Sequence, residues 1–588
     1  MKLFRRHRRR RRRDDLGRVA TRSFLRVELE GTRKQAIENG RFRLVVAGAL
    51  FALAFAVVGG QLIKVSLFGA DYRPLARHSE DEAGYSSARA DLVDRNGVLI
   101  ATNLPAASLY ADPTLVLEVE EAASRLTALM PELSYDTLLA KLTADRRYVS
   151  IKRHLTPRQQ YEINRLGLPG LAFERDERRV YPHGPLLAHA LGYTGIDNRG
   201  LAGLELALNS RLAGEAAQQG EPLALSIDLR VQHVLHEELS AAVVEFEALG
   251  AAGLVLDVET GEVLAMVSLP DFNPNLPGQP DANDRFNRTT LGVYEMGSTF
   301  KIFTLAAALD SGVVTLSDGY DVSEPIKISR YLIRDYHPEN RFLTVPEIFM
   351  YSSNIGAAKM AIDLGTERQR TFLGSLGLLN APEIELPELG APLTPSPWRE
   401  INTMTISYGH GIAVPPLSLA RATAAMINGG LLRPATLLKR DDATGAPGVP
   451  VIRPETSDIM RTLLRLVVDE GTGKNAAAPG FQMGGKTGTS EKVVAGSYER
   501  KALITSFVGA FPMDAPRYVV LVMVDEPHGN AKTFGYATAG WTAAPSVGRV
   551  VSRIGPLLGV TPAGPDTKPD TEDVLVTIDS EGAELASF

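Results

Sequence analysis

A run of uncharged residues near the N-terminus constrains this chain more than any other feature. Residues 44–63 (LVVAGALFALAFAVVGGQLI) contain no charged side chain, and a helix of that length covers about 30 Å, the thickness of the hydrocarbon core of a bilayer. The preceding segment carries 16 Lys and Arg against 5 Asp and Glu. Because basic flanks stay on the cytoplasmic side, the sequence predicts a cytoplasmic tail (1–43), one membrane-spanning helix (44–66) and an extracytoplasmic remainder.

Two other interpretations of this region compete with that one. A cleaved signal peptide usually has an apolar core of about 7 to 15 residues, and the small-residue spots that resemble a cleavage site lie inside the run instead of after it. The arginine block at 5–13 (RRHRRRRRR) could be a nucleic-acid arm, but its place ahead of an apolar span favours a topology signal near anionic lipid. We therefore expect an uncleaved anchor and no nucleic-acid partner.

The chain is long enough for two or three folded domains. The 588 residues are 44% hydrophobic and include no cysteine, which excludes thiol nucleophiles, cysteine zinc sites and disulfides. Asn96-Gly97, within ADLVDRNGVLIATN, predicts a β-hairpin. Near Glu221 the pattern changes, because a strand at 223–227 leads into an amphipathic helix that Asp228 can cap. We expect a first domain at 67–221, a second at 222–559 and a flexible acidic tail at 560–588.

The second domain has strands at its two ends and helices between them. GLVLDVETGEVLAMVS (253–268) predicts a hairpin about Thr260-Gly261. Near the other end, residues 504–512 and 518–527 are two apolar strands joined by a turn, and over two hundred mostly helical residues separate the two pairs. A sheet split around a helical insertion predicts an α+β fold with helices against an antiparallel sheet.

One short stretch of that insertion suggests chemistry. In GSTFK, Ser298 and Lys301 are three residues apart, which on a helix places both side chains on one face. A serine hydroxyl becomes a nucleophile when a neighbouring base takes its proton, and a neutral lysine amine can do so. The lysine pKa must then fall by about 3 from its reference value near 10.4, which burial and a second nearby cation could cause. The hypothesis therefore requires another lysine nearby.

Two further motifs supply candidates for the rest of a site. Ser352-Ser353-Asn354 begins an apolar helix, and Lys486-Thr487-Gly488-Thr489 follows a Gly-Gly turn. S-x-x-K alone arises by chance on the order of once or twice in such a chain, but K-[ST]-G-[ST] only about 0.02 times. Gly488 is expected to leave the edge of its strand bare, so that a substrate backbone can lie along it.

The three motifs in this order resemble the signature set of penicillin-binding proteins and serine β-lactamases. GTGKNAAAPGFQMGGKTGTSEK and ISYGHGIAVPPLSLARATAAMINGG are similar to class B penicillin-binding proteins. The first domain agrees, because it carries the short signatures of their pedestal domain. Ala90 stands where the family usually has glycine, and Met296 where proline often precedes Gly-Ser. The pedestal signatures are Arg89 with 94–97, 179–182 and 200–205.

The resemblance implies a D,D-transpeptidase that cross-links the stem pentapeptides of peptidoglycan and is inhibited by β-lactams. Ser298 would attack the carbonyl between the two terminal D-Ala residues and form an acyl-enzyme, with Lys301 as general base. Ser352 would relay the proton to the leaving amine. Asn354 would hold Lys301 and the substrate amide in place.

The resemblance also implies how the substrate is bound. Lys486 would be the second cation, which lowers the pKa of the lysine base and attracts the terminal carboxylate of the stem peptide. The hydroxyls of Thr487 and Thr489, on either side of Gly488, would donate hydrogen bonds to that carboxylate. The oxyanion hole would consist of the backbone N–H groups of Ser298 and Thr489.

No metal and no cofactor are expected. His233 and His236 have i, i+3 spacing on the amphipathic helix, but such positions are more often exposed polar residues than ligands. His410, in the GHG stretch, could lie near the substrate cleft or elsewhere in the domain.

Within the class, Asn354 and the segment 533–550 resemble the septal, FtsI-type enzyme, whereas the elongation-type relative usually has Asp in place of that Asn. The resemblance implies an enzyme of the bacterial inner membrane with its catalytic domain in the periplasm. Its expected partners are a SEDS-type glycosyltransferase (FtsW-like) and other division proteins. The alternatives are an elongation-type transpeptidase, a β-lactam sensor or idle division scaffold of the same fold, and a β-lactamase.

Overall fold

The computed structural model describes residues 89–213, 220–328, 331–440, 447–494 and 497–562, together with nine positions between 45 and 56. Those nine positions are helical, and their large apolar side chains, such as Phe51 and Phe55, are exposed. No helix within the described ranges is long and apolar enough to cross a membrane. The expected span at 44–66 therefore lies mostly outside the described residues, as do the basic tail at 1–43 and the acidic tail from 563 onwards.

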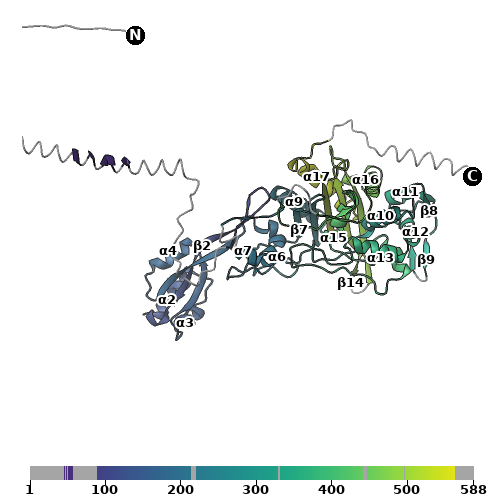
Figure 1. The fold of residues 1–588 in the computed structure, drawn as a ribbon. Coiled ribbons are helices and arrows are strands. Elements are labelled where there is room, and N and C mark those ends of the chain that lie inside the picture. Colours follow the sequence, from purple (N-terminus) through teal and green to yellow (C-terminus); the bar gives the residue numbers. More distant parts are fainter. Residues whose placement is uncertain are drawn as a thin grey trace, which may run out of the picture. The chain divides into compact units, whose positions relative to one another are not determined.

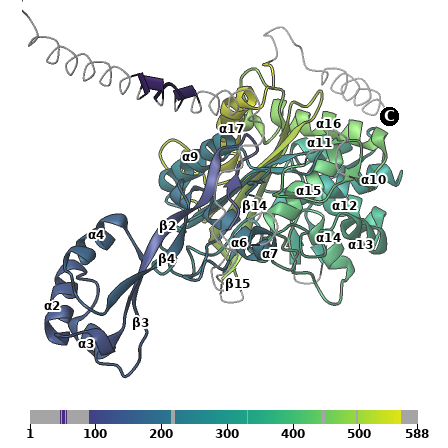
Figure 2. The ribbon, with the colours of Figure 1, turned by 60° about the vertical axis from the view of Figure 1, so that its left-hand side comes forward.

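The first domain is built on a five-stranded sheet with the order β3-β2-β1-β5, in which β4 also pairs with β2. The strand β5, which pairs with β1, comes from just beyond the expected boundary at 221. The hairpin predicted at Asn96-Gly97 is confirmed, because β1 and β2 are antiparallel and Gly97 has a φ of +85°, which glycine adopts without strain. Helices α2, α3 and α4 pack on the far half of β2, over a core of their own (Figures 1 and 2). These elements are β1 (Leu92–Val93), β2 (Leu99–Ala111), α2 (Val119–Leu129), α3 (Tyr135–Leu142), β3 (Val149–Leu155), α4 (Pro157–Arg165), β4 (Leu171–Val180) and β5 (Leu223–Ala224).

The turn of this hairpin also connects the first domain to the second. Helix α9 (Leu229–Glu245) begins where the sequence predicts, because the Asp228 side chain accepts the N–H of Arg230. Asn96 donates a 3.1 Å hydrogen bond to Asp228, and the N–H of Leu229 donates to Asp94 at 3.2 Å. Two carboxylates and one amide thus fix the first turn of α9 against the hairpin.

The second domain has an antiparallel sheet with the order β14-β15-β16-β6-β7. The predicted hairpin at 253–268 is confirmed as β6 and β7, and the two predicted strands at 504–512 and 518–527 as β15 and β16. β14, which carries Lys486 to Thr489, is an edge strand, as the sequence predicts. The strands are β6 (Gly250–Asp257), β7 (Val263–Leu269), β14 (Gly484–Val494), β15 (Ser497–Phe511) and β16 (Tyr518–Asp525).

Both faces of this sheet are covered by helices. Along β16, Val519 and Leu521 belong to the core shared with α10 (Lys301–Asp310), α15 (Pro416–Ile427) and α16 (Pro454–Asp469). Val520 and Val522 belong to the core shared with α9 and α17 (Ala543–Leu557). Alternate residues of a strand point to opposite faces, so every residue of β16 is buried. Figure 2 shows the two groups of helices on either side of the strands. The sheet is therefore the buried central layer of the domain, and its edge strand β14 carries the third motif.

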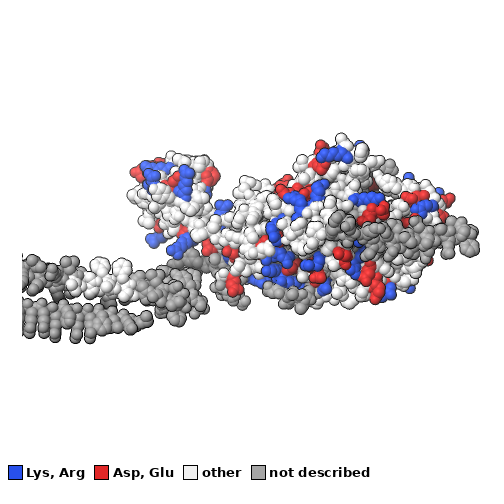
Figure 3. All heavy atoms as spheres, turned by 90° about the horizontal axis from the view of Figure 1, so that it is seen from above, with Lys and Arg blue, Asp and Glu red and all other residues white. Residues whose placement is uncertain are grey.

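The expected helical insertion lies between β7 and β14, and its described residues also form three short two-stranded sheets that the sequence did not predict. The insertion comprises η4 (Gly297–Phe300), α10 (Lys301–Asp310), β8 (Gly319–Asp321), β9 (Ile326–Ile328), β10 (Tyr331–Ile333), β11 (Phe342–Thr344), α11 (Val345–Met350), α12 (Asn354–Leu364), α13 (Thr366–Ser375), α14 (Glu400–Ile406), α15 (Pro416–Ile427), β12 (Leu431–Leu432), β13 (Val449–Pro450), α16 (Pro454–Asp469) and η5 (Lys474–Ala476). Helix α17 (Ala543–Leu557) ends the domain. Acidic and basic side chains are interspersed over the face drawn in Figure 3.

Candidate active site

The predicted nucleophile and base lie together at the start of α10. Ser298 is in the 3-10 turn η4 and Lys301 begins the α-helix, with 3.0 Å between Ser298 Oγ and Lys301 Nζ. Gly297 enters this turn with a φ of +56°, and a Cβ there would lie 2.6 Å from the carbonyl oxygen of Thr489. Only glycine allows the serine turn to pack so closely on strand β14.

The second motif completes the surroundings of the Lys301 amine. Ser352 Oγ lies 3.0 Å and Asn354 Oδ1 2.8 Å from Lys301 Nζ, which also contacts the Ser352 carbonyl oxygen. With Ser298 Oγ, four oxygen atoms therefore surround one nitrogen. An ammonium has three hydrogens and no acceptor. A neutral amine has a lone pair, which can accept the Ser298 proton.

The third motif adds a second buried amine. Lys486 Nζ on β14 lies 2.9 Å from Ser352 Oγ, so this hydroxyl bridges the two lysines. Lys486 is fully buried and Lys301 is 2% exposed. Within the described ranges, neither amine has an ion pair with a carboxylate. The sequence hypothesis required a second lysine near Lys301, and the structure places one there.

The pKa values follow from this burial. The pKa of Lys301 is well below its usual value, first because burial disfavours the ammonium and second because Lys486 is close, while Asp335 acts in the opposite direction. Burial lowers the pKa of Lys486 to about 7. A buried amine loses its proton when no anion compensates the charge. Lys301 is therefore suited to act as a base at neutral pH.

The remaining residues of the third motif lie beside the two lysines. The Thr487 hydroxyl is 2.8 Å from that of Thr472, which precedes strand β14. The Thr489 hydroxyl accepts the N–H of Ala539 at 3.1 Å, and its own proton can be donated to a ligand. The close packing of Gly297 on Thr489 brings together the two backbone segments that are expected to form the oxyanion hole.

Glycine is required at position 488 for a different physical reason from the one expected. A Cβ at this position would lie 2.2 Å from the carbonyl oxygen of Met296 and 2.7 Å from Ser506 Oγ. The missing side chain therefore makes room for the serine turn that packs over the strand, whereas we expected it to leave the strand edge free for a substrate. The edge position of β14 itself agrees with the expectation.

His410 lies beside the serine turn. Its Nδ1 is 3.2 Å from Oε2 of Glu295, three residues before the serine, and its ring is 4.6 Å from the ring of Tyr498. A Cβ at the neighbouring Gly409 would lie 2.1 Å from the carbonyl oxygen of Gly297. The GHG stretch is thus packed against the backbone that carries the nucleophile.

The other two histidines of interest lie on α9, away from these motifs. His233 and His236 approach Glu237 at 3.6 Å and Asp271 at 2.8 Å, respectively. In the parts of the chain that the structure describes, no three potential ligands are grouped as a metal site.

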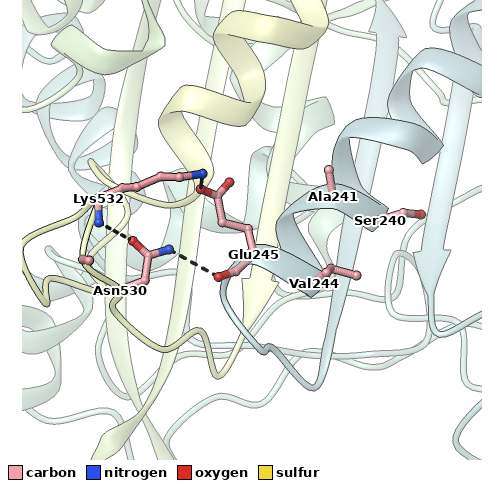
Figure 4. A pocket seen from close by; sticks show the side chains of 7 residues that line it. Ser240, Ala241, Val244, Glu245, Asn530 and Lys532 are labelled. Carbon is pink, nitrogen blue, oxygen red and sulfur yellow. Dashed lines mark hydrogen bonds and ion pairs between the residues drawn. The ribbon is translucent and has the colours of Figure 1, made fainter.

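A hollow at the C-terminal end of α9 contains none of the predicted site residues. Lys532 pairs with Glu245 at 2.9 Å, and Asn530 donates to the Glu245 carbonyl at 3.3 Å (Figure 4). Ser240, Ala241 and Val244 line the opposite wall. These contacts fasten the loop after β16 to the helix, and the Lys532 amine is exposed and paired with a carboxylate, unlike the buried amine of Lys301.

Sequence reasoning missed two residues at the site. Thr472 was quoted only within a longer resembling stretch, and its hydroxyl contacts Thr487 and lies 3.5 Å from Lys486 Nζ. Asp335 belongs to none of the motifs, yet its carboxylate accepts hydrogen bonds from the second motif. Neither residue has a periodic pattern around it that could have pointed to the site.

The pedestal signatures meet in a separate buried cluster. Arg89 Nε and Arg179 Nε donate to the two carboxylate oxygens of Glu205 at 2.9 and 2.7 Å. The Tyr181 hydroxyl donates to the same carboxylate at 3.4 Å. All four side chains are buried. Three signatures that are far apart in the sequence thus serve one structural centre in the first domain.

A serine hydroxyl against a buried lysine amine, with a hydroxyl bridge to a second lysine, is the site of a serine enzyme that transfers acyl groups. Residues 251–546 match the family described as penicillin binding protein transpeptidase domain, and residues 85–220 match the penicillin-binding protein dimerisation domain. The chain belongs to the class B penicillin-binding proteins.

Curated relatives match over most of their length. The chain is 40% identical to the probable peptidoglycan D,D-transpeptidase FtsI of Caulobacter vibrioides, over 89% of this chain and 90% of the relative. It is 30% identical to the peptidoglycan D,D-transpeptidase FtsI of Escherichia coli, over 91% and 95%. The transpeptidase domain of penicillin-binding protein 3 from Burkholderia pseudomallei is 37% identical, with a TM-score of 0.52, over 58% of this chain and 98% of that one.

Proposed function

We propose that the protein is a serine-type peptidoglycan D,D-transpeptidase that cross-links stem pentapeptides of the septal wall during cell division. The observation that carries this proposal is the 3.0 Å contact between Ser298 Oγ and the amine of Lys301. The pKa of this amine is lowered by its burial and by the nearby Lys486. The names of the relatives in Caulobacter and Escherichia coli support the same activity.

Acylation would begin when Ser298 Oγ attacks the carbonyl carbon between the two terminal D-Ala residues. The hydroxyl proton passes to Lys301, and the backbone N–H groups of Ser298 and Thr489 stabilise the oxyanion. When the C–N bond breaks, the leaving amine takes a proton through Ser352, whose Oγ lies 3.0 Å from Lys301 Nζ. D-Ala leaves and an ester to Ser298 remains.

Deacylation would use the amine of a second stem peptide in place of water. Lys301 removes a proton from that amine as it attacks the ester, and Ser298 recovers its hydroxyl. In the preceding acylation, Lys486 attracts the terminal carboxylate of the donor and the hydroxyls of Thr487 and Thr489 donate hydrogen bonds to it, and this carboxylate leaves with D-Ala. Asn354 keeps the base in place through its 2.8 Å contact. A β-lactam would acylate the same serine and remain attached, because its leaving group stays part of the product.

The nucleophile can be tested by labelling with fluorescent penicillin. We expect the wild type to be labelled, Ser298→Ala to remain dark, and mass spectrometry to locate the adduct on Ser298. Ser240→Ala on α9 is a control that also removes one serine hydroxyl, and it should be labelled like the wild type. An unlabelled wild type would support the alternative of an idle scaffold, and labelled Ser298→Ala would disprove the nucleophile.

The septal role is supported by Asn354 and by relatives named FtsI. Depletion of the protein in its own cells should therefore produce filaments, with growth restored by the wild type and not by Ser298→Ala. Rounded cells would instead support the elongation-type alternative.

The same proposal includes a single membrane anchor at 44–66, a cytoplasmic tail at 1–43 and a periplasmic catalytic domain. The exposed apolar side chains at the described positions of the anchor support it. We place the pedestal at 67–221 and the catalytic domain at 222–559, followed by a tail at 560–588. The expected partners are an FtsW-like glycosyltransferase and other division proteins. Protease added outside the inner membrane should degrade the catalytic domain, and co-purification of the glycosyltransferase should require the anchor.

A further inference from the structure

Asp335 is a buried carboxylate that the mechanism above does not use. It lies in the loop between β10 and β11, and only 6% of it is exposed. The loop brings it to the N-terminus of α12, where the second motif begins. The question is whether this carboxylate acts only as a helix cap or also positions the site.

The contacts of Asp335 fall on three successive residues, the last two of the second motif and the residue that follows them. Its Oδ1 accepts the backbone N–H groups of Asn354 at 2.5 Å and Ile355 at 3.0 Å. Its Oδ2 accepts the hydroxyl of Ser353 at 2.7 Å, and that hydroxyl accepts the N–H of Gly356 at 3.0 Å. The carboxylate therefore satisfies two N–H groups at the N-terminus of α12 and fixes the serine that satisfies a third.

The loop that carries Asp335 also orients the side chain of Asn354. Asn354 Nδ2 donates to the carbonyl of Arg334 at 3.1 Å, which leaves Oδ1 to face Lys301 Nζ at 2.8 Å. One end of the amide is thus held by the loop and the other end serves the base. A shift of this loop would move the Asn354 oxygen relative to the amine.

The backbone of Ser352, which directly precedes the residues that Asp335 holds, has an unfavourable conformation. Its φ is +63°, a conformation that costs a non-glycine residue on the order of 1–3 kcal/mol and persists only when the surroundings hold it. In this conformation both its carbonyl oxygen and its hydroxyl contact Lys301. The residues that follow Ser352 are the ones that Asp335 holds.

We propose that Asp335 is a positioning residue for acyl transfer, whose carboxylate holds the backbone of residues 353–355 so that Ser352 and Asn354 present their oxygens to Lys301, and whose negative charge acts on the Lys301 amine. The proposal rests on the acyl transfer proposed above. A residue that only capped α12 would affect stability and leave the protonation of Lys301 unchanged.

The charge has a predictable effect. The charged groups that act on Lys301 are Lys486 on β14, which lowers its pKa, and Asp335, which raises it. Removing the negative charge should therefore let Lys301 lose its proton at lower pH. Acylation requires the neutral amine, so the acid limb of the pH–rate profile would move to lower pH.

The experiment measures the second-order rate constant of acylation by fluorescent penicillin as a function of pH. Asp335→Asn keeps an oxygen that can accept from the backbone and an amide that can donate to Ser353, but it removes the charge. We expect its acid limb at lower pH than that of the wild type and its plateau lowered by up to about tenfold. Asp335→Ala removes the contacts as well, and we expect its plateau to fall by a factor of about 100 or more.

Asp257→Asn is the matched control. Asp257 is buried, and its carboxylate accepts two backbone N–H groups, those of Glu259 and Thr260, in the turn between β6 and β7. Its pH–rate profile should coincide with that of the wild type. If Asp335→Ala does not fold, Asp335→Asn still decides the outcome.

An unshifted acid limb in Asp335→Asn, or wild-type acylation in Asp335→Ala, would overturn the proposal. These results differ from a failure of the proposed function, in which the wild type itself would not be acylated.

Discussion

Each of the two domains buries a cluster of ionisable side chains, and the clusters differ in whether acidic and basic groups are paired. In the first domain, Glu205 lies between the guanidinium groups of Arg89 and Arg179, at 2.9 and 2.7 Å. In the second domain, Lys301 and Lys486 share the hydroxyl of Ser352, at 3.0 and 2.9 Å. Both clusters are almost completely shielded from solvent. Only the first has opposite charges in direct contact.

This difference indicates a structural role for the cluster around Glu205 and a catalytic role for the cluster of two lysines. A carboxylate that accepts hydrogen bonds from two guanidinium groups joins the three segments that carry these side chains, and the loss of one partner leaves an uncompensated buried charge. Two amines with hydroxyl, amide and carbonyl partners instead lose proton affinity. The first arrangement organises the pedestal, and the second produces a base. Substitutions in the two clusters should therefore affect different measurements.

The largest effect is expected at the base. Lys301→Met keeps a long apolar side chain and removes the amine, so acylation by penicillin should slow by a factor of about 10²–10⁴. The free energy of unfolding should change less than in a Glu205 variant, because no uncompensated charge is created. Stopped-flow labelling and chemical denaturation measure the two quantities. A rate within tenfold of the wild type would contradict the assigned base.

Glu205→Gln should produce the converse result. The two arginines would lose their counter-charge in a dry site, and we expect a loss of about 3–5 kcal/mol in the free energy of unfolding. The acylation rate per folded molecule should not change. Glu162→Gln, which breaks the exposed pair with Arg158 in α4, should cost no more than about 0.5 kcal/mol. Equal stability of Glu205→Gln and Glu162→Gln would remove the distinction between the clusters.

The third prediction concerns pH and stability. Lys486 has a pKa of about 7 in the folded protein, against about 10.4 when unfolded. Between these values the unfolded state binds a proton that the folded state does not, so stability rises with pH, by up to about 1.4 kcal/mol per pH unit. The wild type should gain stability relative to Lys486→Met between pH 7 and 10. A difference that stays constant over this interval would show that the amine is not buried as described.

Much of this architecture could be predicted from the sequence because the signals are local. The turn at Asn96-Gly97, the hairpin at Thr260-Gly261 and the helix start at Asp228 each follow from a few adjacent residues. The pair Ser298 and Lys301 is also local. The need for a second cation followed from the pKa that the base must have.

What could not be predicted depends on contacts between distant segments. Asp335 reaches the second motif from a loop, and nothing in its neighbourhood distinguishes it from a surface aspartate. The pedestal signatures were visible one by one, but their convergence on Glu205 joins residues 116 positions apart. Gly488 was identified as a required glycine, yet the atom that requires it, the Met296 carbonyl oxygen, belongs to a turn almost two hundred residues earlier.

The smallest effects come from one chemical change made in both domains. Tyr181→Phe and Tyr498→Phe each remove a hydroxyl that donates to a glutamate, at 3.4 Å to Glu205 and at 3.0 Å to Glu295. Tyr181 is buried and Tyr498 is exposed. We expect Tyr181→Phe to cost about 0.5–1.5 kcal/mol of stability and to leave acylation unchanged.

Tyr498→Phe should show the opposite pattern. Its hydroxyl is partly in solvent, so its loss should hardly affect unfolding. However, Glu295 stands three residues before Ser298 and also accepts the N–H of Gly411 at 3.0 Å, so a looser carboxylate would let the serine turn move and slow acylation a few-fold. Denaturation curves and labelling rates for both variants test the pair. Both variants lose the same hydroxyl group. If both changed only the free energy of unfolding, or both changed only the acylation rate, stability and catalysis would not be assigned to different domains as we propose.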